Sequence, residues 1–185
     1  MGPGSMSFFA KCKSLCGQWI RGTEGSEGVE FALIWVPFVY VTFAIIEISL
    51  FFAGANMLES GVNASARMIK TGQIQTGGGD QEDAFRQALC TQLFILVDCE
   101  NVDLEVVPMP NNQFTDAENY QPQYDEDGHL ISSGFNAGGA NTVVLIRVAY
   151  RYQLWTPLFA QIFSTEPDHA IPLLTTVVLE TEPYS

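Results

Sequence analysis

The feature that most constrains this chain is a long apolar stretch near its N-terminus. No charged residue occurs from Phe31 to Ile46, and after Glu47 the sequence is again uncharged as far as Leu58. A helix from Phe31 to Phe52 would rise about 33 Å, which is enough to cross a hydrocarbon core of about 30 Å. A buried core helix is the alternative, but the rest of the sequence offers too little to cover a helix that is apolar on all sides. We therefore predict a membrane-spanning helix.

The helix is expected to continue beyond the span as an amphipathic one. Pro37 removes one backbone hydrogen bond and should kink or soften the helix, which a membrane tolerates. Gly72 is the expected C-terminal stop, so we predict one helix from about Val29 to Thr71, within an anchor segment over 26–72. Beyond the span, apolar residues repeat at three- and four-residue spacing, as is typical of an amphipathic helix, at Ala55, Leu58, Val62, Ala66 and Ile69.

The acidic residues are concentrated in the C-terminal part of the chain. The 21 Asp and Glu residues against 8 Lys and Arg give a net charge of −13. Residues 1–70 hold five acidic and five basic residues, so the whole of this charge belongs to residues 71–185. Such a chain offers no basic surface for nucleic acid. By the positive-inside rule the N-terminus lies in the cytoplasm and the acidic part outside it, because three basic residues precede the span: Lys11, Lys13 and Arg21.

The chain is predicted to consist of a leader, the anchor and an acidic C-terminal domain. Residues 1–5, ahead of Met6, are interpreted as a cloning remnant, and residues 6–25 as a cytoplasmic leader. The α+β C-terminal domain, 73–185, is expected to lie in the periplasm or outside the cell. Its predicted elements are a flexible linker over 73–80, a helix over about 81–97, strands over 102–107, 141–152 and 173–182, a short helix from Thr156, and a long structureless loop over 108–139.

Three hypotheses describe how the N-terminus is processed. Signal peptidase could cut after Ala53-Gly54-Ala55, although the preceding apolar stretch is long for a signal peptide. The helix could instead stay uncleaved as a signal anchor. The third hypothesis rests on Gly25-Ser-Glu-Gly-Val-Glu30-Phe31, in which a glycine, four residues and a glutamate precede an apolar helix. This is the pattern that prepilin peptidase cuts, here between Gly25 and Ser26.

Glu30, Pro37 and Glu47 are the anchor residues expected to shape helix assembly. Cutting after Gly25 would free an amine on Ser26, and unpaired charge near a membrane is costly. In a filament, Glu30 could neutralise the amine of a neighbouring subunit and set its axial register; alternatively, it is a solvated residue favoured by the helix dipole. Glu47 lies about 25 Å further along, where it either snorkels at the outer interface or makes a polar contact to another membrane helix.

Three stretches of the anchor form a recognisable pattern. They are Gly-Val-Glu-Phe-Ala-Leu at 28–33, Pro37 followed by Ile-Ile-Glu-Ile-Ser at 45–49, and Asn-Ala-Ser-Ala-Arg-Met-Ile-Lys-Thr-Gly-Gln at 63–73. This pattern resembles that of the TadE-like family, the pseudopilins or minor pilins of the Tad (Flp) type IV pilus. The likeness extends to a two-cysteine region, at 85–90 and Cys99, and to the closing segment at 173–184.

The resemblance implies a pilin-like α+β fold, with the long N-terminal helix packed on a small antiparallel sheet and a second helix. It implies processing by prepilin peptidase at Gly25 and a role in assembling or priming a thin adhesive pilus. The implied partners are prepilin peptidase, other pilins and pseudopilins of the Tad system, the inner-membrane assembly platform and the membrane. The implied location is the inner membrane, as a single-pass protein with a cytoplasmic N-terminus and a periplasmic C-terminal domain, or the cell surface within the pilus.

Two pairs of cysteines differ in their expected chemistry. Cys90 and Cys99 lie outside the cytoplasm in this topology, where disulfides form. A bridge that closes about ten residues adds roughly 2–3 kcal/mol in the chain-entropy model, and two reduced, buried thiols are the alternative. Cys12 and Cys16 lie in the leader and are expected to be free thiols.

The sequence offers no set of residues suited to an enzyme or a cofactor. Its two histidines, His129 and His169, stand in no nucleophile or metal-ligand motif, and no glycine-rich phosphate loop follows a strand. Asp125 and Asp127 could hold Ca²⁺, but their spacing falls short of a full calcium loop and a solvated turn is favoured. A Ca²⁺-dependent adhesive or ligand-binding domain is therefore one alternative function, and an uncleaved scaffold of the pilus secretion machine is another.

Overall fold

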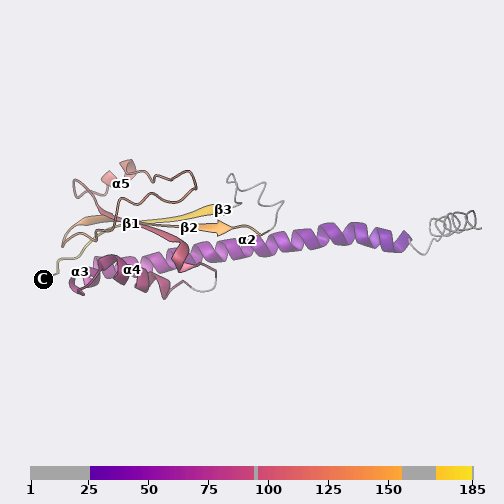
Figure 1. Ribbon diagram of the computed structural model, residues 1–185, viewed down its shortest axis with the longest axis horizontal. Coiled ribbons are helices and arrows are strands. Elements are labelled where there is room, and N and C mark those ends of the chain that lie inside the picture. The colour runs from indigo at the N-terminus through magenta and orange to yellow at the C-terminus, as the bar shows by residue number, and fades with distance from the viewer. Residues whose placement is uncertain (1–25, 94–95, 156–169, 185) are drawn as a thin grey trace, which may run out of the picture. The chain divides into compact units, whose positions relative to one another are not determined.

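One long helix and a three-stranded sheet dominate the computed structural model, which describes residues 26–93, 96–155 and 170–184 (Figure 1). The sheet has the strand order β1-β2-β3, and both pairs are antiparallel. The predicted α+β architecture, a long N-terminal helix followed by a small antiparallel sheet and further helices, is confirmed. The elements are α2 Ser26–Lys70, α3 Gln73–Thr76, α4 Gln81–Cys90, the 3-10 helix η2 Cys99–Asn101, β1 Val102–Pro108, α5 Asp116–Asn119, β2 Val143–Gln153 and β3 Ala170–Glu180.

The long helix α2 runs through Pro37 without interruption and ends close to the predicted position. Gly72 adopts the left-handed conformation, with φ at 76°, which residues with a Cβ rarely adopt. The ring of Tyr184 covers this glycine, so that a Cβ there would collide with it. The N–H of Glu182 donates to the carbonyl of Lys70 over 2.8 Å. The last residues of the chain thus cap the end of α2.

The chain divides into two compact units, one ending at Ile45 and the other beginning at Ile46. In the first unit, every described side chain is exposed or half-buried. The second unit contains the rest of α2 together with the sheet and the remaining helices. The hydrophobic core of the protein therefore lies in the second unit.

The core lies between the second half of α2, the helix α4 and one face of the sheet. The stripe predicted for α2 faces this core, and so do alternate residues of β2. Gly61 lets α4 approach closely, because a Cβ there would lie only 3.2 Å from Cδ1 of Leu89. The principal buried residues are Leu58, Val62, Ala66 and Ile69 of α2, Phe85 and Leu89 of α4, and Val144, Ile146, Val148 and Tyr152 of β2.

The helix α4 is shorter than predicted, because it ends at Cys90 and not near Val97. Cys90 forms a disulfide with Cys99, nine residues later, and their Cα atoms lie 5.6 Å apart. A helix reaching Val97 would carry the two cysteines too far apart for a bridge, since each residue adds about 1.5 Å. The predicted disulfide is confirmed, and it explains why the predicted helix length is wrong.

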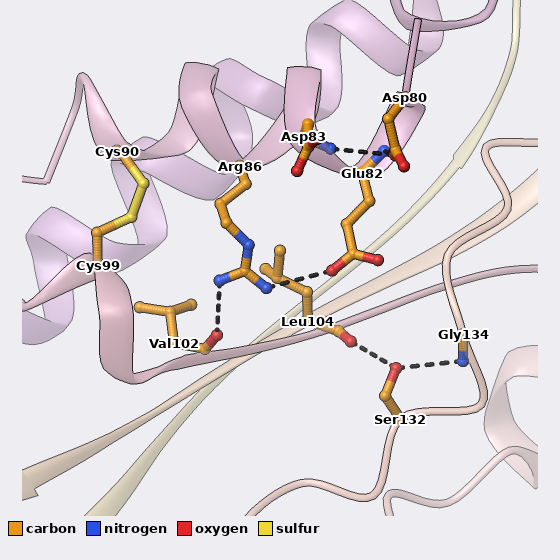
Figure 2. A network of polar contacts seen from close by, with 10 residues as sticks. All are labelled: Asp80, Glu82, Asp83, Arg86, Cys90, Cys99, Val102, Leu104, Ser132 and Gly134. Carbon is orange, nitrogen blue, oxygen red and sulfur yellow. Dashed lines mark hydrogen bonds and ion pairs between the residues drawn. A yellow bond between two sulfur atoms is a disulfide. The ribbon is translucent and has the colours of Figure 1, made fainter.

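Polar contacts hold the start and the middle of α4, and the disulfide holds its end (Figure 2). Asp80 caps its start by accepting the backbone N–H groups of Glu82 and Asp83. Arg86 forms an ion pair with Glu82 at 3.2 Å and donates to the carbonyl of Val102 over 3.2 Å. The helix is thus joined to the start of β1 by a side chain as well as by the disulfide.

The predicted flexible linker over 73–80 is partly wrong, since its first four residues form α3. Ile74 is buried in the core. The side-chain amide of Gln75 donates to the carbonyls of Ala137 and Ile69, over 2.9 Å and 3.2 Å. Only the glycines at 77–79, two of which have positive φ, match the expected turn. The burial of Ile74 and the hydrogen bonds of the Gln75 amide order the segment. Neither contact produces a periodic pattern in the sequence.

The segment over 108–139, predicted to be structureless, is ordered against the sheet. It contains α5 and two isolated β-bridges, one of which pairs Phe135 with Val106 of β1. Met109 packs with Val143 and Leu145 of β2 on the face of the sheet opposite the core. The segment therefore covers the second face of the sheet, which explains how so long a connection stays compact.

The three predicted strands are confirmed with shifted ends. The last strand begins at Ala170 and ends at Glu180, against a prediction of 173–182. It contains Pro172, paired with Arg151 of β2; proline is tolerated because β3 is an edge strand. The short helix predicted from Thr156 lies outside the described residues.

Candidate functional site

The predicted processing and assembly residues lie at the start of α2. Gly25 is outside the described residues, and the helix begins at the next residue, Ser26. Glu30 and Phe31 are both exposed. Ser26 and Glu30 are four residues apart, the spacing that makes two residues neighbours on one helix face. An amine created at Ser26 would therefore lie about one helical turn from Glu30 along the helix axis.

The first part of α2 exposes an apolar surface on all its sides. By length and composition, α2 is able to cross a membrane, which indicates membrane anchoring. Phe31 stacks on Trp35 with ring centres 5.6 Å apart, and Trp35 lies 6.0 Å from Phe38. The exposed large apolar residues of this part are Val29, Phe31, Leu33, Ile34, Trp35, Val36, Phe38, Val41, Phe43, Ile45 and Ile46.

Glu47 lies where α2 first contacts the sheet. Its exposed fraction is 5%, and its carboxylate accepts the backbone N–H of Trp155. One turn later, the ring of Phe51 meets that of Tyr152 edge-on at 5.5 Å. The same tyrosine packs beside Gly54, at an ordinary van der Waals distance of 3.8 Å from the position of a Cβ. The two hypotheses for Glu47 were snorkelling at the outer interface and a polar contact to another membrane helix. The structure shows a hydrogen-bond partner within the same chain, Trp155.

The contact with α2 alters the acidity of Tyr152. Burial raises the pKa of its phenol above the ordinary value of 10.0, and the nearby charges of Glu47 and Tyr150 raise this pKa further. The folded state therefore favours the protonated phenol. The resulting stabilisation is fully present below pH 10 and is lost as the pH rises through the higher folded pKa.

We expect Glu47→Gln to lower the pKa of Tyr152 while leaving it above the ordinary value, because burial is the larger cause. The measurement is phenolate absorbance against pH, with Tyr152→Phe subtracted to isolate this tyrosine. Glu59, which is exposed on the same helix as Glu47, serves as the matched control, since Glu59→Gln should leave the Tyr152 titration unmoved. A Tyr152 titration that Glu47→Gln leaves unmoved would contradict the contact.

The weak calcium candidates take part in a turn. One oxygen of Asp125 accepts the N–H of Asp127 over 3.0 Å and that of His129 over 2.8 Å. Gly128 has φ at 78° within this turn. Among the described residues, no three His, Cys, Asp or Glu side chains are grouped so as to hold a metal ion. His169, like Cys12 and Cys16, lies outside the described residues.

Sequence reasoning missed a buried ion pair on the second face of the sheet. Glu105 of β1 and Arg147 of β2 lie opposite each other in the register, with charged groups 3.3 Å apart. Trp155, the partner of Glu47, was missed as well. Opposite charges in the middle of two predicted neighbouring strands were a usable signal for the ion pair. No local pattern linked Trp155 to Glu47.

The described geometry can be set beside known protein families. The family model described as TadE-like protein matches residues 25–67, from the predicted processing site through the exposed part of α2 and most of its amphipathic part. The resemblance inferred from the anchor is thereby confirmed over that range. No curated protein and no solved structure matches the chain.

Proposed function

We propose that this chain, whose residues 25–67 match the model of the TadE-like protein family, is a minor pilin that assembles or primes a Tad pilus used in adhesion. Prepilin peptidase cuts it between Gly25 and Ser26. The chain does no chemistry of its own and acts through contacts with other pilins and with the inner-membrane assembly platform.

The observation that carries this proposal is the position of the family match on the helix. The match begins at Gly25, and α2 begins one residue later. The exposed apolar surface that follows is suited both to lipid and to the helices of other pilins. In the proposed filament, Glu30, one turn into the helix, neutralises the amine of a neighbouring subunit.

The proposed topology puts the C-terminal domain in the periplasm, with α2 crossing the inner membrane once. The disulfide between Cys90 and Cys99 supports this side of the membrane, because such bonds persist in oxidising compartments. The acidic surface beyond Lys70 then faces basic partners or cations.

We expect N-terminal sequencing of the mature protein to begin at Ser26. Replacing Gly25 by valine should abolish this cut, whereas Gly22→Val should leave it intact, because only Gly25 has the right offset to Glu30. A full-length leader would favour the uncleaved scaffold, and a start at Asn56 would favour signal peptidase. Either result would contradict the proposed processing.

Substitution of Glu30 separates processing from assembly. Glu30→Ala should leave the protein in the membrane but abolish pili in a strain that needs it, as counted by electron microscopy. Glu27→Ala is the matched control, because Glu27 is exposed on the same helix but lies three residues closer to the cut. Normal pili with Glu30→Ala would remove the assembly role of this carboxylate.

A further inference from the structure

Two contacts within the second unit, at Glu47 and at Lys70, fix the direction of the sheet along this part of α2. Glu47 directly follows Ile46, the last residue of the uncharged stretch, and accepts the N–H of Trp155 just past β2. At the opposite end of α2, the carbonyl of Lys70 accepts the N–H of Glu182, just past β3. β2 therefore runs back along α2, and it ends beside the point where the apolar stretch ends.

Trp155 is exposed to an unusual degree at this end of the sheet. The exposed fraction of the residue is 88%, whereas Tyr152 and Leu154 just before it pack on the core. Glu47 accepts the backbone N–H of Trp155, so the point from which the exposed ring projects is fixed. A tryptophan ring that stays in water does not gain the free energy of removing its large apolar area from water.

We propose that Trp155 inserts into the outer interface of the membrane that α2 crosses, and that Glu47 is the positioning residue that sets its depth. The inference rests on the proposed membrane anchoring of α2. The indole would lie at the boundary between lipid headgroups and acyl chains. There its apolar body is buried and its N–H still finds hydrogen-bond acceptors.

The chemistry of Glu47 accounts for the coupling. A carboxylate at the edge of the hydrocarbon is costly unless it is hydrogen-bonded, and the backbone N–H of Trp155 supplies such a bond. The same bond satisfies a strand-end donor that would otherwise approach lipid without an acceptor. One contact therefore stabilises the junction and holds the indole level with the end of the apolar stretch.

Depth-dependent fluorescence quenching tests this inference on the full chain. The three tryptophans are Trp19, Trp35 and Trp155, so double substitutions to phenylalanine leave either Trp155 or Trp35 alone. Each variant is reconstituted into phosphatidylcholine vesicles whose acyl chains carry bromine at shallow or deep positions. We expect Trp155 to lose more emission with shallow bromines than with deep ones, and Trp35, within the apolar stretch, to be quenched as well, which reports insertion of α2.

The two tryptophans make the outcomes distinguishable. If Trp35 is quenched and Trp155 is not, the inference fails while the anchor stands. If neither is quenched, the anchor itself fails and the inference with it. Unquenched Trp155 emission that shifts to shorter wavelength as protein is added relative to lipid would mean that a second copy covers the ring, which also overturns the inference.

Substitution of Glu47 tests its role in positioning. In the variant that retains only Trp155, Glu47→Leu removes the acceptor and should reduce the preference for shallow over deep bromines. Glu47→Gln retains a carbonyl acceptor and should preserve that preference. An unchanged depth profile with Glu47→Leu would show that Glu47 does not position the indole.

Discussion

Replacing Arg147 by methionine is expected to lower the free energy of unfolding of the C-terminal domain by about 3–5 kcal/mol, because the change leaves a buried carboxylate without its partner. Arg147 and Glu105 are exposed by only 4% and 2%. Their charged groups lie 3.3 Å apart across neighbouring strands. An exposed pair of the same geometry would be worth about 1 kcal/mol or less, so burial decides the size of the effect.

The same pair fastens the segment over 108–139 to the sheet. Arg147 donates to the carbonyl of Tyr120, and its guanidinium carbon lies 5.0 Å from the centre of the Tyr120 ring. Glu105 accepts the hydroxyl of Tyr120 over 3.1 Å and the N–H of Ser133 over 3.2 Å. Loss of either charge should therefore also speed amide hydrogen exchange at Ser133, since this N–H loses its acceptor or the order around it.

A double-mutant cycle separates the charge effect from simple loss of packing. Urea unfolding of the full chain in detergent, followed by near-ultraviolet circular dichroism, gives each free energy. Glu105→Leu with Arg147→Met should recover part of the loss, because no buried charge then remains. Arg151→Met is the matched control, since Arg151 lies on the same face of β2 but is half-buried. Additive losses in the double variant would contradict a buried pair.

The parts of the fold that were predictable from sequence are those that local periodicity determines. The stripe from Leu58 to Ile69 faces the core because three- and four-residue spacing has one meaning in a helix. The alternation along 143–153 likewise places Val144, Ile146 and Val148 on the core face and Arg147 on the opposite face. Gly72 was predictable as a helix stop because few other residues adopt its conformation.

The parts that were not predictable depend on partners far away in the chain. Trp155 reaches Glu47 across 108 residues, and no pattern around either residue indicates the other. The segment over 108–139 has no period because scattered contacts order it, namely hydrogen bonds to Glu105 and Arg147 and the packing of single apolar residues such as Met109. The apolar spacing continues in a helical pattern beyond Cys90, but the disulfide between Cys90 and Cys99 ends α4 there. The spacing of apolar residues gives no sign of this bond.

Removing the disulfide is expected to lower the free energy of unfolding by about 2–3 kcal/mol, because the unfolded chain regains the entropy of an open loop of about ten residues. The bridge joins the last residue of α4 to the first of η2, immediately before β1. The measurement compares Cys90→Ala with Cys99→Ala, made together, against the parent chain by urea unfolding. Both chains carry Cys12→Ser and Cys16→Ser, so that the leader thiols cannot exchange.

The reduced parent chain is the internal control for this prediction. With a reducing agent present, the parent should unfold at nearly the urea concentration of the double variant; without it, the two should differ. Arg86 still donates to the carbonyl of Val102 when the bridge is absent, and Phe85 and Leu89 still fill the core. The double variant should therefore fold, and its α4 amides should exchange faster than those of β2. Equal stability of the oxidised parent and the double variant would mean that the bridge constrains neither state, and the early end of α4 would then need another cause.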